Sequence, residues 1–167
     1  MAKITLGGNP TTTNTDLPKV GEKLDDFSFT ANDMSEVKLS DFKGKNVILN
    51  IFPSVDTGVC ATSVRKFNEK VANLDNTVVL CISRDLPFAQ KRFCGAEGIE
   101  NAITLSDFKN PEFAEKIGTA IQDGAFAGLN ARAVIALDSE GKVIYNELVN
   151  EIGNEPDYDT VLKSMNS

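Results

Sequence analysis

The sequence of 167 residues contains no histidine. This absence removes histidine-based general acid–base catalysis, Ser-His and Cys-His dyads, and zinc sites built from cysteine and histidine. An activated nucleophile in this chain must therefore rely on backbone dipoles, hydroxyl groups, arginine or lysine.

Long apolar runs are also missing, and this excludes a transmembrane helix. Residues 1–8, Met-Ala-Lys-Ile-Thr-Leu-Gly-Gly, lack the apolar core of a signal peptide. We therefore expect a cytoplasmic protein that does not associate with membranes.

Basic residues are fewer than acidic residues in this chain. The chain has 17 lysine and arginine residues against 24 aspartate and glutamate residues, which gives a net charge of −7. An acidic surface keeps a protein soluble and repels phosphate backbones, so we expect no binding of nucleic acid.

Cysteines are few, at Cys60, Cys81 and Cys94. Their odd number and wide spacing do not resemble the disulfide framework of a secreted protein. In a reducing cytoplasm, a cysteine pair is more plausibly catalytic or redox-active than structural. The length and an apolar content of 41% predict one globular domain over residues 1–167.

Hydrophobic periodicity predicts strands that alternate with helices, followed by an antiparallel hairpin. Residues 1–20 suggest a short N-terminal β-hairpin or extended arm, and residues 37–44 an irregular or helical turn. The predicted strands cover residues 27–30, 46–52, 77–83, 102–105, 131–137 and 142–148. The predicted helices cover residues 59–74, 86–96, 110–117 and 157–165. This order indicates an α/β protein with a thioredoxin-like fold, in which helices flank a central mixed sheet as a three-layer sandwich.

Cys60 stands at the junction of a predicted strand and helix, in the run Pro53-Ser-Val-Asp-Thr-Gly-Val-Cys60. Unpaired backbone N–H groups and the positive end of the helix dipole both favour the thiolate, which is the nucleophile. Most free cysteines are instead small buried hydrophobic residues. Against that alternative, Gly58 leaves room for a ligand, and Thr57 could cap the helix or bond to a bound oxygen.

The same run resembles the Pro-x-x-x-Thr-x-x-Cys signature of the peroxiredoxins, and its residues 54–60 are similar to those of the thiol peroxidase subfamily. The resemblance extends over nearly the whole chain. It includes residues 39–45, 83–94 and 129–134.

The resemblance implies a thiol-dependent peroxidase that serves in antioxidant defence. Cys60 would be the peroxidatic cysteine and would pass through a sulfenic acid. Thr57 would hydrogen-bond the peroxide and the sulfur, Pro53 would shield the site, and Arg132 would support the thiolate and polarise the peroxide. Taken by itself, Arg132 would be a strand residue paired with a surface carboxylate.

By the same resemblance, Cys94 would be the resolving cysteine and would form an intramolecular disulfide with Cys60. Because a disulfide needs Cα atoms within roughly 7 Å, we expect both segments to unwind locally on oxidation. Its neighbours Lys91 and Arg92 suggest an exposed position and favour its thiolate. Cys81 lies in a central-strand pattern and is predicted to be a core residue.

The implied partners are thioredoxin as reductant, hydrogen peroxide or an organic hydroperoxide as substrate, and a second copy in a homodimer. No metal, haem or flavin is implied. A thiol–disulfide oxidoreductase is an alternative. Its Cys-x-x-Cys motif is absent, because the residues three positions before and after Cys60 are Thr57 and Ser63. A redox-sensing or chaperone-like interaction protein is a third possibility. The acidic pair Asp25-Asp26 and the carboxylates of residues 151–159 are interpreted as solvated surface.

Overall fold

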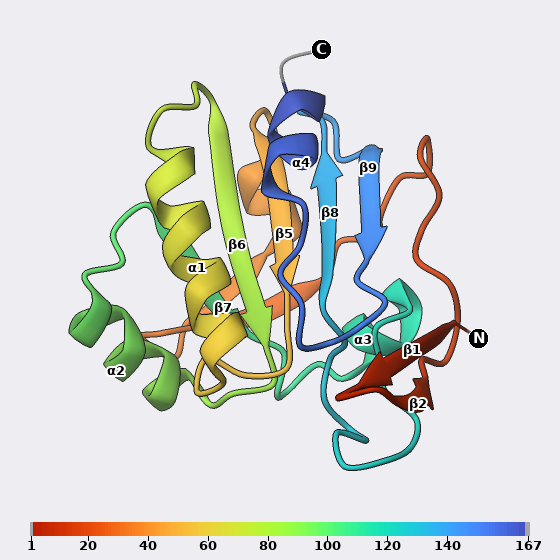
Figure 1. Cartoon of the computed structure of the whole chain (residues 1–167). Coiled ribbons are helices and arrows are strands. Elements are labelled where there is room, and N and C mark those ends of the chain that lie inside the picture. Colours follow the sequence, from red (N-terminus) through yellow and green to blue (C-terminus); the bar gives the residue numbers. More distant parts are fainter. Residues whose placement is uncertain (1, 166–167) are drawn as a thin grey trace.

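The computed structural model describes residues 2–165, and a mixed sheet of seven strands passes through the middle of this part of the chain (Figure 1). The strand order across the sheet is β4-β3-β7-β6-β5-β8-β9, and β1 and β2 form a separate antiparallel hairpin. The strands are β1 (Lys3–Leu6), β2 (Asn9–Thr12), β3 (Ser28–Ala31), β4 (Glu36–Lys38), β5 (Asn46–Ile51), β6 (Thr77–Ser83), β7 (Ala102–Ser106), β8 (Ala133–Leu137) and β9 (Val143–Leu148). The helices are the 3₁₀ helix η1 (Leu39–Phe42), α1 (Gly58–Val71), α2 (Pro87–Glu97), α3 (Glu112–Ile117) and α4 (Tyr158–Ser164).

Strand direction determines which chain segments meet at one edge of the sheet. β5 runs parallel to β6 and antiparallel to β8, with Ile51 opposite both Ile82 and Ala133. The chain leaves β5 and β6 at the edge where it enters β8. Residues that follow β5 and β6 therefore lie beside the residue that precedes β8, at the lower end of the sheet in Figure 1.

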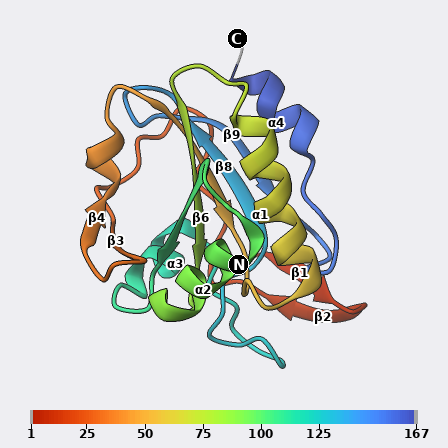
Figure 2. The same cartoon turned by 90° about the vertical axis from the view of Figure 1, so that its left-hand side faces the viewer.

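Two hydrophobic cores cover the two faces of the sheet, because successive strand side chains point to opposite faces. Helices α1 and α4 cover one face, while α3 and the β3–β4 segment lie over the other (Figure 2). Val64 and Phe67 of α1 pack with Ile48 and Val79 on the first face. The alternating strand neighbours Leu49 and Leu80 belong to the core of the other face.

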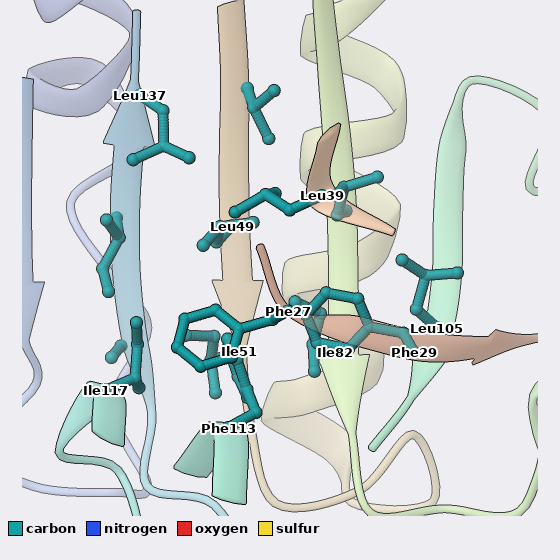
Figure 3. Packing of buried hydrophobic residues seen from close by; sticks show 14 of the residues in the cluster. Phe27, Phe29, Leu39, Leu49, Ile51, Ile82, Leu105, Phe113, Ile117 and Leu137 are labelled. Carbon is teal, nitrogen blue, oxygen red and sulfur yellow. The ribbon is translucent and has the colours of Figure 1, made fainter. Parts of the chain in front are cut away.

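Three phenylalanine rings close the core on the α3 side (Figure 3). The Phe113 ring meets Phe27 edge-on with ring centroids 5.0 Å apart, and it meets Phe29 with centroids 4.9 Å apart. Edge-to-face pairs add to the stabilisation that comes from burial alone. This packing fixes α3 against Ile51 and Ile82, whose strands lead to the edge described above.

The predicted thioredoxin-like architecture and N-terminal hairpin are confirmed. Two local predictions were wrong. Glu36–Lys38 forms the edge strand β4, which the sequence did not reveal because the alternation of three residues is too short to predict a strand. Helix α1 ends at Val71 rather than residue 74, since the Leu74 N–H donates to the Val71 carbonyl and closes a turn.

The prediction of one domain over residues 1–167 stays a prediction, and residues 1, 166 and 167 lie outside the described residues. Among residues 2–165, every helix is too short or too polar to cross a lipid bilayer.

Candidate active site

Cys60 is the third residue of α1, and its side chain is fully buried. The first N–H groups of a helix have no partner within the helix, so the helix presents its donors and its positive end to this turn. The Cys60 Sγ atom also lies 3.1 Å from Nη2 of Arg132, which donates to it. Both surroundings stabilise a negative charge on the sulfur.

Arg132 comes immediately before β8, so the pairing of β8 with β5 carries it to the segment that follows β5. Its side chain is 1% exposed, and its Nε donates to the Ile152 carbonyl at 2.8 Å. No carboxylate among the described residues forms an ion pair with Arg132, so the alternative of a strand residue paired with a surface carboxylate does not hold. The Cys60 sulfur is therefore the polar side-chain partner that the structure gives to this buried guanidinium.

The remaining nitrogen of the Arg132 guanidinium, Nη1, is a buried donor without an acceptor among the described residues. A buried donor that lacks a partner is costly, and such groups often face a ligand. The guanidinium therefore donates to Cys60 Sγ through Nη2, while Nη1 stays available to a bound acceptor. Within residues 2–165, no group of three or more His, Cys, Asp or Glu side chains is arranged to hold a metal ion.

Thr57 and Pro53 lie in the loop between β5 and α1. Thr57 occupies the N-cap position of α1, but its side chain makes no capping bond to the helix. Its Oγ1 donates instead to the Ser54 carbonyl at 3.2 Å, so of the two possibilities that the sequence left open for Thr57, the helix cap is not formed. Pro53 is buried, and the Gly58 position opens onto free space.

Asp85, two residues after the end of β6, holds this loop. Its Oδ1 accepts from Ser54 Oγ at 2.7 Å, and its Oδ2 accepts from the Val55 N–H at 2.8 Å and from Ser83 Oγ at 2.6 Å. Sequence reasoning did not single out Asp85. The available signal was a carboxylate just beyond a buried strand that neighbours β5, where functional loops gather.

Glu151 fastens the N-terminal hairpin to the loop that carries Ile152. Its carboxylate accepts from the backbone N–H of Gly153 at 2.8 Å, of Gly8 at 2.8 Å and of Gly7 at 3.1 Å, and from Thr5 Oγ1 at 2.9 Å. These hydrogen bonds lower the pKa of Glu151 to about 2, and the bond from the Gly153 N–H has the largest effect. The expectation that Glu151 is simply a solvated surface group was therefore wrong.

Cys94 lies near the end of α2 and is half-buried against the hydrophobic cluster that includes Cys60. Its Sγ is 3.2 Å from Thr104 Oγ1 and accepts from Asn32 Nδ2 at 3.7 Å. The Arg92 guanidinium pairs with a carboxylate rather than with the Cys94 sulfur, since its Nη2 donates to Asp56 at 3.2 Å. The Cys60 and Cys94 thiols are both free, and they share no hydrogen-bonding partner.

Cys81 is fully buried on β6, as predicted. Burial raises the pKa of its thiol to about 12, although a hydrogen bond from Asn50 opposes the shift. The Asn50 Nδ2 lies 3.7 Å from the sulfur. Cys81 therefore remains a neutral thiol, which is a weak nucleophile.

Comparison with known proteins identifies relatives of this chain. The redoxin family, described as "Redoxin", matches residues 19–162. The thiol peroxidase of Corynebacterium glutamicum is 54% identical over 166 residues, which cover 99% of this chain and 100% of that protein.

Solved structures show the same fold. A peroxiredoxin-like protein from Aquifex aeolicus superposes with a TM-score of 0.94 at 40% identity, covering 99% of this chain and 96% of that one. A thiol peroxidase from Chromobacterium violaceum superposes with a TM-score of 0.91 at 20% identity, covering 98% and 95% of the two chains. The second likeness, at its low identity, concerns the fold alone.

Proposed function

This chain belongs to the redoxin family, and within it to the thiol peroxidases of the peroxiredoxin group, and from this premise we propose that Cys60 attacks the hydroperoxide. The protein is a thiol-dependent peroxidase. The observation that carries the assignment is the 3.1 Å contact between Cys60 Sγ and Nη2 of the buried Arg132. It joins the sulfur to a guanidinium whose Nη1 has no acceptor among the described residues, which supports the proposal.

In the first step, the Cys60 thiolate attacks the terminal oxygen of the hydroperoxide, and the O–O bond breaks. The sulfur gains that oxygen with its hydrogen and becomes a sulfenic acid, while hydroxide or alkoxide leaves and takes a proton to become water or alcohol. Donors aimed at the leaving oxygen lower the barrier because negative charge develops there. In this proposal Nη1 of Arg132, a buried donor without an acceptor among the described residues, would take this role.

Thr57 complements Arg132 in this proposal. Its hydroxyl proton is engaged by the Ser54 carbonyl, so its Oγ1 offers lone pairs rather than a proton. Thr57 would accept the hydrogen bond from the O–H of the peroxide, which turns the terminal oxygen toward Cys60. The buried Pro53 beside it keeps water from the sulfur.

In the second step, the Cys94 thiol condenses with the Cys60 sulfenic acid to give a disulfide and water. Cys94 is bonded to Thr104 and Asn32, so it must leave α2 and the first turn of α1 must unwind. Thioredoxin then reduces the disulfide by thiol–disulfide exchange. Such a reductant works in a reducing compartment, and we place the enzyme in the cytoplasm.

The proposal is tested by NADPH oxidation coupled through thioredoxin reductase and thioredoxin, with hydrogen peroxide or cumene hydroperoxide as substrate. The protein with all three cysteines should turn over continuously. The Cys94→Ser variant should consume about one equivalent of peroxide and then stop, because its sulfenic acid has no partner. Continuous thioredoxin-dependent turnover by Cys94→Ser would remove Cys94 from the mechanism.

We also propose that the enzyme acts as a homodimer with its interface near the active-site loops. The start of α2 exposes Leu86 at 51% and Phe88 at 66%, and it lies next to the Asp85 carboxylate that holds the loop. Exposed neighbouring apolar side chains mark interaction surfaces. Sedimentation should find a dimer for the unchanged chain and a monomer for Phe88→Glu, whereas a monomer for both would refute the dimer.

A further inference from the structure

The loop that precedes Cys60 is held by one carboxylate. We propose that Asp85 is a positioning residue of the peroxidase reaction, and this inference rests on the proposed role of Cys60. Asp85 touches neither sulfur. It acts through Ser54 and Val55, whose hydroxyl and N–H it binds at 2.7 Å and 2.8 Å.

Ser54 connects Asp85 to Thr57, the residue that is proposed to bind the peroxide. The Ser54 carbonyl accepts both from the Thr57 Oγ1 and from the Thr57 N–H, each at 3.2 Å. Asp85 fixes Ser54, and Ser54 fixes the hydroxyl that is to accept the hydrogen bond of the peroxide. Because catalysis by orientation depends on placement within about 1 Å, a loop released from Asp85 presents Thr57 less often in the productive position.

The same carboxylate is anchored on the sheet and on α2. Ser83 Oγ donates to Asp85 at 2.6 Å and accepts from Nε2 of Gln90 at 3.1 Å. Gln90 is fully buried and also donates to the Leu105 carbonyl at 2.9 Å. The Asp85 backbone carbonyl accepts from Ser106 Oγ. The Asp85 carboxylate, anchored to β6, β7 and α2, therefore gives the loop between β5 and α1 a fixed point of attachment.

The change Asp85→Asn isolates this role. An amide nearly matches the carboxylate in shape, but it replaces one acceptor oxygen by a group that only donates, opposite donors from Ser54, Val55 and Ser83. We expect the second-order rate constant for oxidation of Cys60 by cumene hydroperoxide to fall about tenfold or more. Quenching with an alkylating reagent, followed by mass spectrometry of the Cys60 peptide, measures this rate directly.

A second readout separates positioning from general damage to the site. Arg132 keeps its contact with Cys60 in the variant, so the pH midpoint for alkylation of Cys60 by iodoacetamide should stay unchanged. A double-mutant cycle with Ser54→Ala should show strong coupling, with the double variant scarcely slower than Asp85→Asn alone. Fully additive losses, or an alkylation midpoint that shifts together with the peroxide rate, would overturn the inference.

Asp26→Asn is the matched control. Asp26 also accepts a serine hydroxyl and a backbone N–H, from Ser40 at 2.9 Å and 2.8 Å, but it lines a cavity with Val47 at the start of β5, away from the site. Its rate should equal that of the unchanged protein. If peroxide oxidises Cys60 in the unchanged protein and in Asp85→Asn at the same rate, the positioning role alone is refuted. If peroxide leaves Cys60 unmodified in the unchanged protein, the proposed function and the inference are refuted together.

Discussion

Replacing Cys60 with serine is expected to abolish peroxide turnover, with a loss of at least about 10⁴-fold. A serine hydroxyl is far less acidic than a thiol, so the Arg132 guanidinium and the helix N-terminus cannot keep it ionised. The variant should also form no sulfenic acid that a dimedone probe can trap. The measurement is the same thioredoxin-coupled assay, with trapping followed by mass spectrometry.

Cys81→Ser is the matched control for this prediction, because it makes the same chemical change at a buried cysteine on β6. The fold can accept it, since Asn50 offers its Nδ2 donor and the otherwise unpaired Oδ1 acceptor to a new hydroxyl. Turnover should stay near that of the unchanged protein. Substantial activity in Cys60→Ser, or its loss only in Cys81→Ser, would contradict the assignment of the nucleophile.

Removing the Arg132 guanidinium should have the next largest effect. Arg132→Met keeps an apolar stem of similar length, but it removes the donor to Cys60 Sγ and the free donor Nη1. Loss of one donor at a site of developing charge costs about 10²- to 10³-fold in rate. We expect a fall of at least that size in peroxide reduction, and a shift of Cys60 alkylation to higher pH.

Arg132→Lys separates charge from geometry. A lysine restores the positive charge, but its compact ammonium lacks the fork that holds the Ile152 carbonyl and the sulfur together. Its alkylation profile should lie closer to that of the unchanged protein, while its peroxide rate stays well below it. An Arg132→Met variant within twofold of the unchanged rate would exclude the guanidinium from the reaction.

How far the sequence could predict this site differs from residue to residue. Cys60 could be found because a strand-to-helix junction and the first turn of a helix both leave marks in the local pattern. Arg132 could be found only by resemblance, since an arginine followed by an apolar strand looks ordinary. Its burial depends on the pairing of β8 with β5, which joins residues far apart in the chain.

Asp85 and Glu151 could not be predicted for a related reason. A carboxylate in an acidic chain is usually solvated. The place of Asp85 just beyond a buried strand is a weak local signal that does not show which group it holds, and Glu151 has no such signal. Their partners lie at Ser54 and Thr5, brought near only when the sheet and the hairpin are assembled. By contrast, the alternation of β5 and β6 with α1 is a local pattern, so the architecture itself was predictable.

The bonds around Arg132 tie the finished site to both ends of the chain. Arg132 depends on the Ile152 carbonyl, and the Ile152 N–H donates to the Thr5 carbonyl of the hairpin at 2.9 Å. During synthesis, a ribosome that has released residues up to 130 has delivered Cys60 and α1 but neither Arg132 nor its acceptor. Contacts of such long sequence separation form late in folding. Under the proposed roles of Cys60 and Arg132, a nascent chain that still lacks Arg132 and Ile152 would carry the thiol without its guanidinium donor. Its reactivity toward peroxides would develop only after these two residues have been synthesised.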